Sequence, residues 1–128
     1  MEDDEAGGVE EGLLPKNLQL TKDPTQRKEQ ITRLARLLTG PNATARRVAA
    51  KLLGRSEQLD VVPDLIYALT DPDPYVPSIA EESLRLLSRK LNAKNLDTQP
   101  SNPERAEAVD YWKKWYLGLK PDYIFIDL

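Results

Sequence analysis

The sequence predicts an all-α fold, an α-solenoid of stacked helical hairpins with about two and a half repeats and a capping C-terminal helix. Three observations lead to this prediction. Apolar residues recur at the i, i+3, i+4, i+7 spacing that places them on one face of a helix. Glycine and proline stand between these periodic segments, where helices end and begin. The chain also matches itself, without gaps, when it is shifted by 31 residues.

The amino-acid composition excludes several kinds of functional site. The chain has 128 residues, enough for one small domain, and contains neither cysteine nor histidine. Disulfides, Cys/His zinc sites and Ser–His or Cys–His catalysis are therefore excluded. No apolar run is long enough to cross a membrane, and the N-terminus does not resemble a signal peptide. We expect a cytoplasmic protein; a targeting segment lost before Met1 is the alternative.

Residues 1–22 are predicted to form a disordered acidic tail. Residues 1–15 contain six acidic groups and no basic one. Such a segment has too little apolar surface to offset the conformational entropy lost on ordering. The helical repeat domain is expected to span residues 23–128.

The first repeat, residues 24–54, is predicted to contain two helices. Asp23 or Thr25 caps the first helix, and Gly40 ends it. Asn42 caps the second helix, and Gly54 ends it. The apolar positions of the first helix are Ile31, Leu34, Ala35 and Leu38, and those of the second are Ala45, Val48, Ala49, Leu52 and Leu53.

The second repeat, residues 57–91, follows the same plan. Its first helix is expected to begin at Ser56 or Asp60 and to continue through Leu69. The run DPDP at residues 71–74 breaks this helix, and Asp73 is the expected cap of the next one. That fourth helix should bury Val76, Ile79, Ala80, Leu84 and Leu87 and end near Leu91.

Residues 92–101 are polar and aperiodic, which predicts a linker. Residues 102–128 are expected to form the capping helix and a tail. Asn102 is the expected N-cap, and Pro121 follows the predicted end at Gly118. One face of the helix should contain Ala106, Val109, Trp112 and Tyr116. Residues 123–126 are expected to be an extended tail packed on the last helices, with a short strand as the alternative.

The internal match aligns residues 31–53 with residues 62–84. Its identities fall on helix-core positions and on the break between helices. At these positions two copies of a repeated helical hairpin need the same residue types. The identical pairs are Leu34/Leu65, Leu38/Leu69, Thr39/Thr70, Pro41/Pro72, Ala49/Ala80 and Leu53/Leu84. Each hairpin has an apolar stripe that it buries only by stacking on its neighbour.

The second repeat resembles a HEAT repeat of the short bacterial type. Residues 62–76 read VPDLIYALTDPDPYV and are followed by Ile79, Ala80 and Leu84. The resemblance covers residues 57–90 well and 27–56 loosely, and it departs from the family at Pro77, where arginine is common. It implies a curved superhelix with a binding or scaffolding role. A few members, among them subunits of bilin lyases and base-excision glycosylases, are catalytic. The run WKKWY at residues 112–116 also resembles the ends of some bacterial HEAT-containing chains.

Basic and acidic residues are concentrated in different segments of the chain. Residues 27–55 contain eight basic groups and one acid, whereas residues 57–82 contain seven acids and no base. One interpretation pairs Lys51 and its neighbours with Glu81 and Glu82 across the stack. The other is a recognition surface with opposite ends, for a dipolar protein partner or for head-to-tail self-association. The predicted interaction surface is Arg33, Arg36, Arg46, Arg47, Lys51, Arg55, Tyr67, Tyr75, Glu81, Glu82 and Trp115.

We therefore expect a non-catalytic protein-interaction or scaffold module. The first alternative is an accessory subunit or relative of the HEAT-type lyases, which would bind an anionic ligand beside Arg46, Arg47 and Lys51. The second is nucleic-acid binding, disfavoured because no aromatic residue lies among these basic residues for base stacking. No catalytic residue, cofactor or metal site is predicted, since Asp71 and Asp73 are interpreted as caps. Trp112 is assigned to the core, and Trp115 or Tyr111 to an exposed interface anchor.

Overall fold

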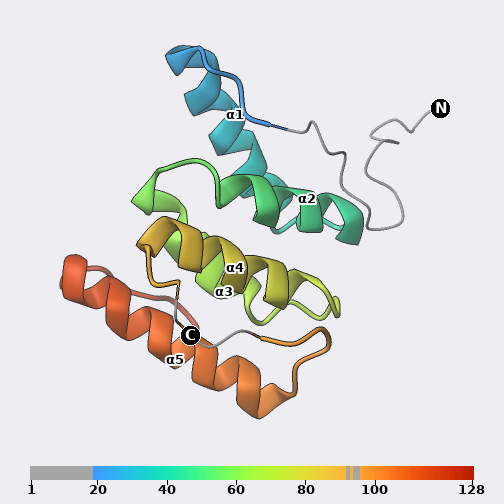
Figure 1. Ribbon diagram of the computed structural model, residues 1–128, viewed down its shortest axis with the longest axis vertical. Coiled ribbons are helices and arrows are strands. Elements are labelled where there is room, and N and C mark those ends of the chain that lie inside the picture. Colours follow the sequence, from blue (N-terminus) through green and yellow to red (C-terminus); the bar gives the residue numbers. More distant parts are fainter. Residues whose placement is uncertain (1–18, 92, 94–95) are drawn as a thin grey trace.

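The computed structural model describes residues 19–91, 93 and 96–128, and in these residues it contains helices but no strand. Figure 1 shows the helices arranged as packed pairs, with α1 at one end of the molecule and α5 at the other. The expected acidic tail lies outside the described residues up to position 18. Its predicted boundary at residue 22 is wrong, because Leu20 is buried and the amide of Thr21 donates to Gln30 Oε1 at 2.8 Å.

The first two helices begin at the predicted caps. Helix α1 spans Pro24–Leu37, and the side chain of Asp23 accepts the Gln26 amide at 2.9 Å. Helix α2 spans Ala43–Leu53, and Asn42 Oδ1 accepts the Ala45 amide at 2.9 Å. Each cap satisfies a backbone N–H group that has no partner inside its helix.

The third helix is shorter than predicted. A 3-10 turn, η2, spans Leu59–Val61, and α3 follows over Val62–Ala68. Neither predicted cap is used: Ser56 is buried and its hydroxyl accepts the Gln58 amide in the preceding turn, while Asp60 lies within η2. Pro63 in the first turn of α3 fits a helix start, because proline lacks the N–H that would be unpaired there.

Helices α4 and α5 each differ from the prediction by a few residues. Helix α4 spans Val76–Ser88 and ends before Leu91, because Arg89 adopts a left-handed φ of 64°. Helix α5 spans Asn102–Leu119, which includes Gly118. Its N-cap is Ser101 and not Asn102. The Ser101 hydroxyl accepts the Glu104 amide at 3.2 Å, and Glu104 accepts the Ser101 amide at 2.8 Å, which forms a capping box.

The core forms where the helices stack. Helix α2 packs against α1 and α4, α3 packs against α4 and α5, and α4 also contacts α5. The predicted apolar faces supply most of this core, but Ala106 is exposed. The largest fully buried apolar side chains are Leu53, Leu65, Ile66, Leu69, Leu84 and Trp112.

Helices α2 and α4 approach closely at Gly54. A Cβ atom at this position would lie 2.3 Å from Ser83 Oγ and 2.8 Å from Ser83 Cα. The Ser83 hydroxyl donates to the carbonyl of Ala50 at 2.6 Å. The glycine predicted as a helix stop therefore also permits the contact between the two hairpins.

The C-terminal segment after α5 is extended without a strand, and its predicted packing on the last helices is confirmed. Tyr67 on α3 donates its hydroxyl to the carbonyl of Ile126. The Phe125 ring lies 6.1 Å from the ring of Tyr116 and 4.8 Å from that of Tyr123. These contacts hold the end of the chain beside α3 and α5.

Candidate interaction surface

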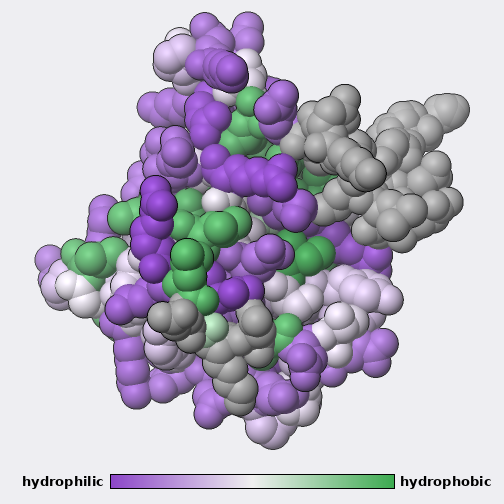
Figure 2. Space-filling view, in the orientation of Figure 1, coloured by the Kyte–Doolittle hydropathy of each residue, from purple (hydrophilic) through white to green (hydrophobic). Residues whose placement is uncertain are grey.

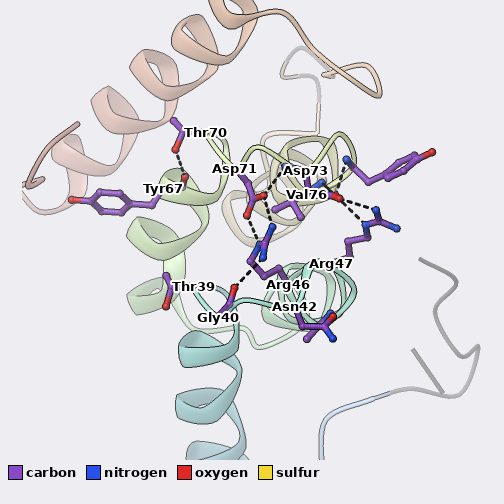
Figure 3. Close-up of polar contacts among 12 residues, drawn as sticks. Thr39, Gly40, Asn42, Arg46, Arg47, Tyr67, Thr70, Asp71, Asp73 and Val76 are labelled. Carbon is purple, nitrogen blue, oxygen red and sulfur yellow. Dashed lines mark hydrogen bonds and ion pairs between the residues drawn. The ribbon is translucent and has the colours of Figure 1, made fainter. Parts of the chain in front are cut away.

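Two arginines of α2 reach across to the acidic loop that joins α3 to α4. Arg46 Nε donates to Asp71 Oδ2 at 2.8 Å, and Nη2 donates to Asp71 Oδ1 at 3.2 Å. Its remaining Nη1 group donates to the carbonyl of Gly40 at 2.9 Å. Figure 3 shows Arg46 directed between these two groups. The guanidinium therefore fastens the loop between α1 and α2 to the loop of the next hairpin.

The second pair has the same form. Arg47 donates to Asp73 through Nε at 3.0 Å and through Nη2 at 2.7 Å. The Asp73 carboxylate also accepts the amides of Tyr75 and Val76, at 2.9 and 3.1 Å (Figure 3). The hydrogen bonds from Arg47 hold the pKa of Asp73 below its ordinary value, and burial opposes this shift only in part. Reciprocally, the bond to Asp73 raises the pKa of Arg47.

These pairs change the interpretation of the charges. The N-cap of α4 is Tyr75 and not Asp73 as predicted, although Asp73 Oδ2 accepts the amide of Val76, the first residue of that helix. The ion pair of Asp73 with Arg47 and that between Arg46 and Asp71 were not anticipated. The expected pairing of Lys51 with Glu81 and Glu82 is wrong for Glu81, which is buried and bonded to α5. The arginines come from positions 46 and 47, one helical turn before Lys51.

The exposed charges stay segregated between the two hairpins. Arg33, Arg36 and Arg55 are exposed on the first hairpin, and Lys51 is half-buried. Between residues 57 and 82 the exposed charged residues are all acids, Glu57, Asp60, Asp64 and Glu82, whereas Arg89 and Lys90, which follow α4, are exposed and basic. The predicted contrast between basic residues 27–55 and acidic residues 57–82 therefore persists at the surface after the two ion pairs are set aside.

Glu81 was predicted to be part of the surface, and this is wrong. Glu81 is 2% exposed, and its Oε1 atom accepts a hydrogen bond from Trp112 Nε1 at 2.8 Å. Burial raises the pKa of the Glu81 carboxyl, and the bond from Trp112 offsets this shift in part. Glu81 lies 31 residues after buried Ala50 in the internal match, a signal that could have indicated an inward position.

The aromatic residues of the predicted surface divide into exposed and packed groups. Tyr75 is 43% exposed, and its ring lies 4.5 Å below the Arg47 guanidinium. Tyr67 is half-buried and holds the C-terminal segment. Trp112 is in the core as predicted, Trp115 is half-buried beside it, and Tyr111 is 45% exposed. Tyr111, rather than Trp115, is therefore the exposed aromatic residue of α5.

Several large apolar side chains are also exposed. Figure 2 shows a largely hydrophilic face with apolar groups over the C-terminal half of α4 and near the C-terminal end of α5. Leu86 in α4 and Leu119, the last residue of α5, are both exposed. Leu59, Leu86 and Leu87 border one depression that Gly54, Glu57 and Arg89 also line, and we call these three leucines the apolar edge. Exposed apolar groups that lie together are a feature of protein-binding surfaces.

The described residues thus belong to an all-helical protein of packed helix pairs. Comparison with protein-family models, with curated proteins and with solved structures finds no significant match. Among the described helices, none combines the length and the apolar character that a membrane span requires. The described residues also contain no group of three or more potential ligands placed to hold a metal ion.

Proposed function

We propose that this chain is a non-catalytic protein-interaction or scaffold module built from HEAT-like helical repeats. The observation that carries the proposal is the segregation of exposed charge, mainly basic over residues 27–55 and acidic over residues 57–82. A surface with opposite ends accelerates encounter with a partner of complementary charge and disfavours other orientations. The apolar edge supplies contact area beside this charged surface.

The two ion pairs support this role because they fix the relative position of the hairpins. Each arginine makes two hydrogen bonds to one carboxylate, so both distance and orientation are restrained. A preorganised surface loses less conformational entropy when a partner binds. Packing of α2 on α4 and of α3 on α5 is what stacked repeats would produce, and it supports the HEAT-like interpretation.

The two alternative functions receive less support from the same contacts. An anionic ligand or a phosphate backbone beside α2 would compete with Asp71 and Asp73 for Arg46 and Arg47. These aspartates are already bonded inside the protein, so displacement would leave two partly buried carboxylates without their partners. We therefore favour a protein partner, and we propose a cytoplasmic location, in keeping with a chain that lacks cysteine.

The test is quantitative retention of proteins from an extract on immobilised wild-type chain, on Arg33→Glu and on Lys90→Glu. Both changed residues are exposed, and each substitution reverses one charge. We expect a partner that elutes as salt rises from about 50 to about 500 mM, the range over which surface charges become screened. Retention should fall for Arg33→Glu and stay unchanged for Lys90→Glu. Sedimentation of the purified chain over the same salt range detects self-association.

Retention that neither salt nor Arg33→Glu alters would contradict a charge-directed module. The same conclusion follows if no protein is retained and the purified chain stays monomeric at low salt.

A further inference from the structure

A groove lies between α1 and the segment formed by η2 and α3. It consists of two depressions, of about 620 and 380 Å³, and Asp64 lines both of them. The first lies beside residues 24–35 of α1, and the second lies beside residues 38–40, which follow that helix. We call the two together the α1–α3 groove. It extends along the whole of α1, a length of about 21 Å.

The groove exists because α1 packs mainly on one neighbour. Helix α1 lies at the end of the stack (Figure 1) and packs on α2, but its contact with α3 is not comparable with that of α3 with α5. Two apolar positions of α1 that were predicted to lie in the core, Ile31 and Ala35, therefore remain half-buried. They line the groove together with Leu38 and Val61, so part of its lining is apolar.

The two walls of the groove differ in charge. Lys28 is exposed on the α1 wall, and Asp64 is exposed on the α3 wall. Neither side chain has an ion pair or a hydrogen bond among the described residues. The surrounding protein desolvates the Asp64 carboxyl enough to raise its pKa, and no basic group opposes this shift. Each wall thus has one charge that the protein does not neutralise.

The other charged residues that line the groove already have partners within the protein. Arg27 donates to three backbone carbonyls, and Asp60 Oδ1 lies 3.9 Å from Lys120 Nζ. Arg46 and Asp71 bond to each other. Recognition of a charged ligand in the groove therefore depends on the two residues without partners, one on each wall.

We propose that the α1–α3 groove binds an amphipathic helix of a partner protein, with its acidic edge beside Lys28 and its basic edge beside Asp64. The proposal rests on the protein-interaction function above and assigns a binding site and a class of partner to it. The groove lies between the basic and the acidic segments of the chain, so a helix in it meets both charges. The apolar face of that helix would cover the half-buried side chains of α1.

A helix fits this groove better than an extended chain. Ile31, Ala35 and Leu38 have the i, i+4, i+7 spacing of a helix surface on which a second helix packs. An extended segment would place backbone N–H and C=O groups against these apolar side chains without hydrogen-bond partners, whereas a helix satisfies them internally. A partner helix of about 14 residues would match α1 in length.

The experiment uses the full chain and three blocked helical peptides of about 15 residues, each with leucines at i, i+4 and i+7. The mixed peptide has glutamates along one edge of the leucine stripe and lysines along the other. The two uniform peptides have only lysine or only glutamate on both edges. Fluorescence anisotropy of the labelled peptides measures Kd. The NMR signal of the Ile31 methyl group, assigned with Ile31→Val, locates the site, and Ile79 of α4 is the reference because it does not line the groove.

We expect the mixed peptide to bind with a Kd of about 10–100 μM and to shift the Ile31 signal saturably. Each uniform peptide should bind about tenfold more weakly, because one of its edges meets a like charge. General attraction predicts a different order. The chain has a formal net charge of −3, so the lysine peptide would then bind most tightly.

Substitutions on the walls should change the preferred peptide. Asp64→Lys makes both walls basic and should favour the glutamate peptide, whereas Lys28→Glu makes both walls acidic and should favour the lysine peptide. Glu29→Lys and Arg33→Glu are the matched controls, because they change the net charge equally at exposed positions of α1 that do not line the groove. Both should keep the mixed peptide tightest. Circular dichroism checks that each variant is folded, and Lys28→Glu, at an exposed position, still decides the outcome if Asp64→Lys is not.

A mixed peptide that leaves the Ile31 signal unmoved, or a lysine peptide that binds the wild type most tightly, would overturn the proposal. So would an unchanged preference in the folded wall variants, or a control that changes the preference as they do. A dimer of the chain alone that Lys28→Glu dissociates would assign the groove to a second copy and would also overturn it. Arg33→Glu should lower retention from an extract but not affinity for the mixed peptide, so the groove can fail while the interaction function stands.

Discussion

Replacement of Gly54 by alanine should separate the two hairpins. An alanine Cβ would meet Ser83 Oγ, Cβ and Cα at 2.3, 2.6 and 2.8 Å, whereas ordinary contacts are 3.4–4 Å. Helix α4 must therefore move away from α2, because the nearest groups include backbone. Overpacking of this kind costs about 1–3 kcal/mol. The hydrogen bond from Ser83 to the carbonyl of Ala50 would also lengthen, at a further cost of about 1 kcal/mol.

The backbone at Gly54 is already right-handed, with a φ of −66°, so alanine introduces no torsional strain there. Its lower unfolded-state entropy returns up to about 1 kcal/mol, which leaves a net loss of about 1–4 kcal/mol in the free energy of unfolding. Gly118→Ala is the matched control. Gly118 is helical and exposed, and nothing lies within 4 Å of its added Cβ, so that variant should be more stable by about 0.4–1 kcal/mol.

Urea unfolding of both variants, followed by circular dichroism at the helical signal, measures these changes. Opposite signs for the two substitutions are expected because only the environment of the added methyl group differs. A Gly54→Ala variant as stable as the wild type would show that α2 and α4 are not held at this separation in solution.

Three further predictions concern side chains that join different elements. Asp73→Asn should lower the free energy of unfolding at neutral pH by about 2–4 kcal/mol, since it weakens both the hydrogen bond from the first amide of α4 and a partly buried ion pair. Because the folded pKa of Asp73 is lowered, the wild type should lose this advantage as pH falls through that pKa, so acid titration of both proteins should bring their stabilities together. Glu81→Gln should raise the melting temperature at pH 7. It removes a buried charge with a raised pKa and keeps an acceptor for Trp112, so the gain should shrink as pH falls towards the unfolded-state pKa of glutamate; an unchanged gain in acid would contradict this account. Tyr67→Phe should speed hydrogen exchange in the C-terminal segment at a global cost of at most about 1.5 kcal/mol, whereas unchanged exchange would show that the ring contacts alone hold that segment.

The sequence was sufficient for features that depend on neighbours along the chain. Asp23 and Asn42 cap their helices by bonds to amides three residues ahead, so the residue type and its position before an apolar period predict them. The N-cap of α5 also depends on neighbouring residues, but it was predicted one residue too late. Ser101 and Glu104 have the three-residue spacing of a capping box, but the adjacent Asn102 is also a good cap, and residue type alone does not decide between neighbours.

Contacts between residues that are far apart in the sequence could not be predicted from local patterns. A buried glutamate contradicts the usual preference of that residue, and it is tolerated at Glu81 because an indole N–H from another helix reaches it. The shortened α3 has a similar cause. The chain enters it through a 3-10 turn and Pro63, and its few residues are fixed by packing on α4 and α5 rather than by intrinsic propensity.

The ion pairs at the junction of the hairpins determine where a ligand can act. The sequence shows eight basic residues in one block but does not distinguish those that bond within the protein from those that remain at the surface. In the structure, Arg46 and Arg47 each have a carboxylate fixed beside them by the same fold. An intramolecular partner of this kind competes at a high effective concentration, so a ligand from solution must displace it at a large cost. Recognition by the first hairpin therefore depends on its other basic residues, among them the exposed Arg33 and Arg36 of α1. For this reason Arg33→Glu, and not a substitution of the paired arginines, tests the proposed function.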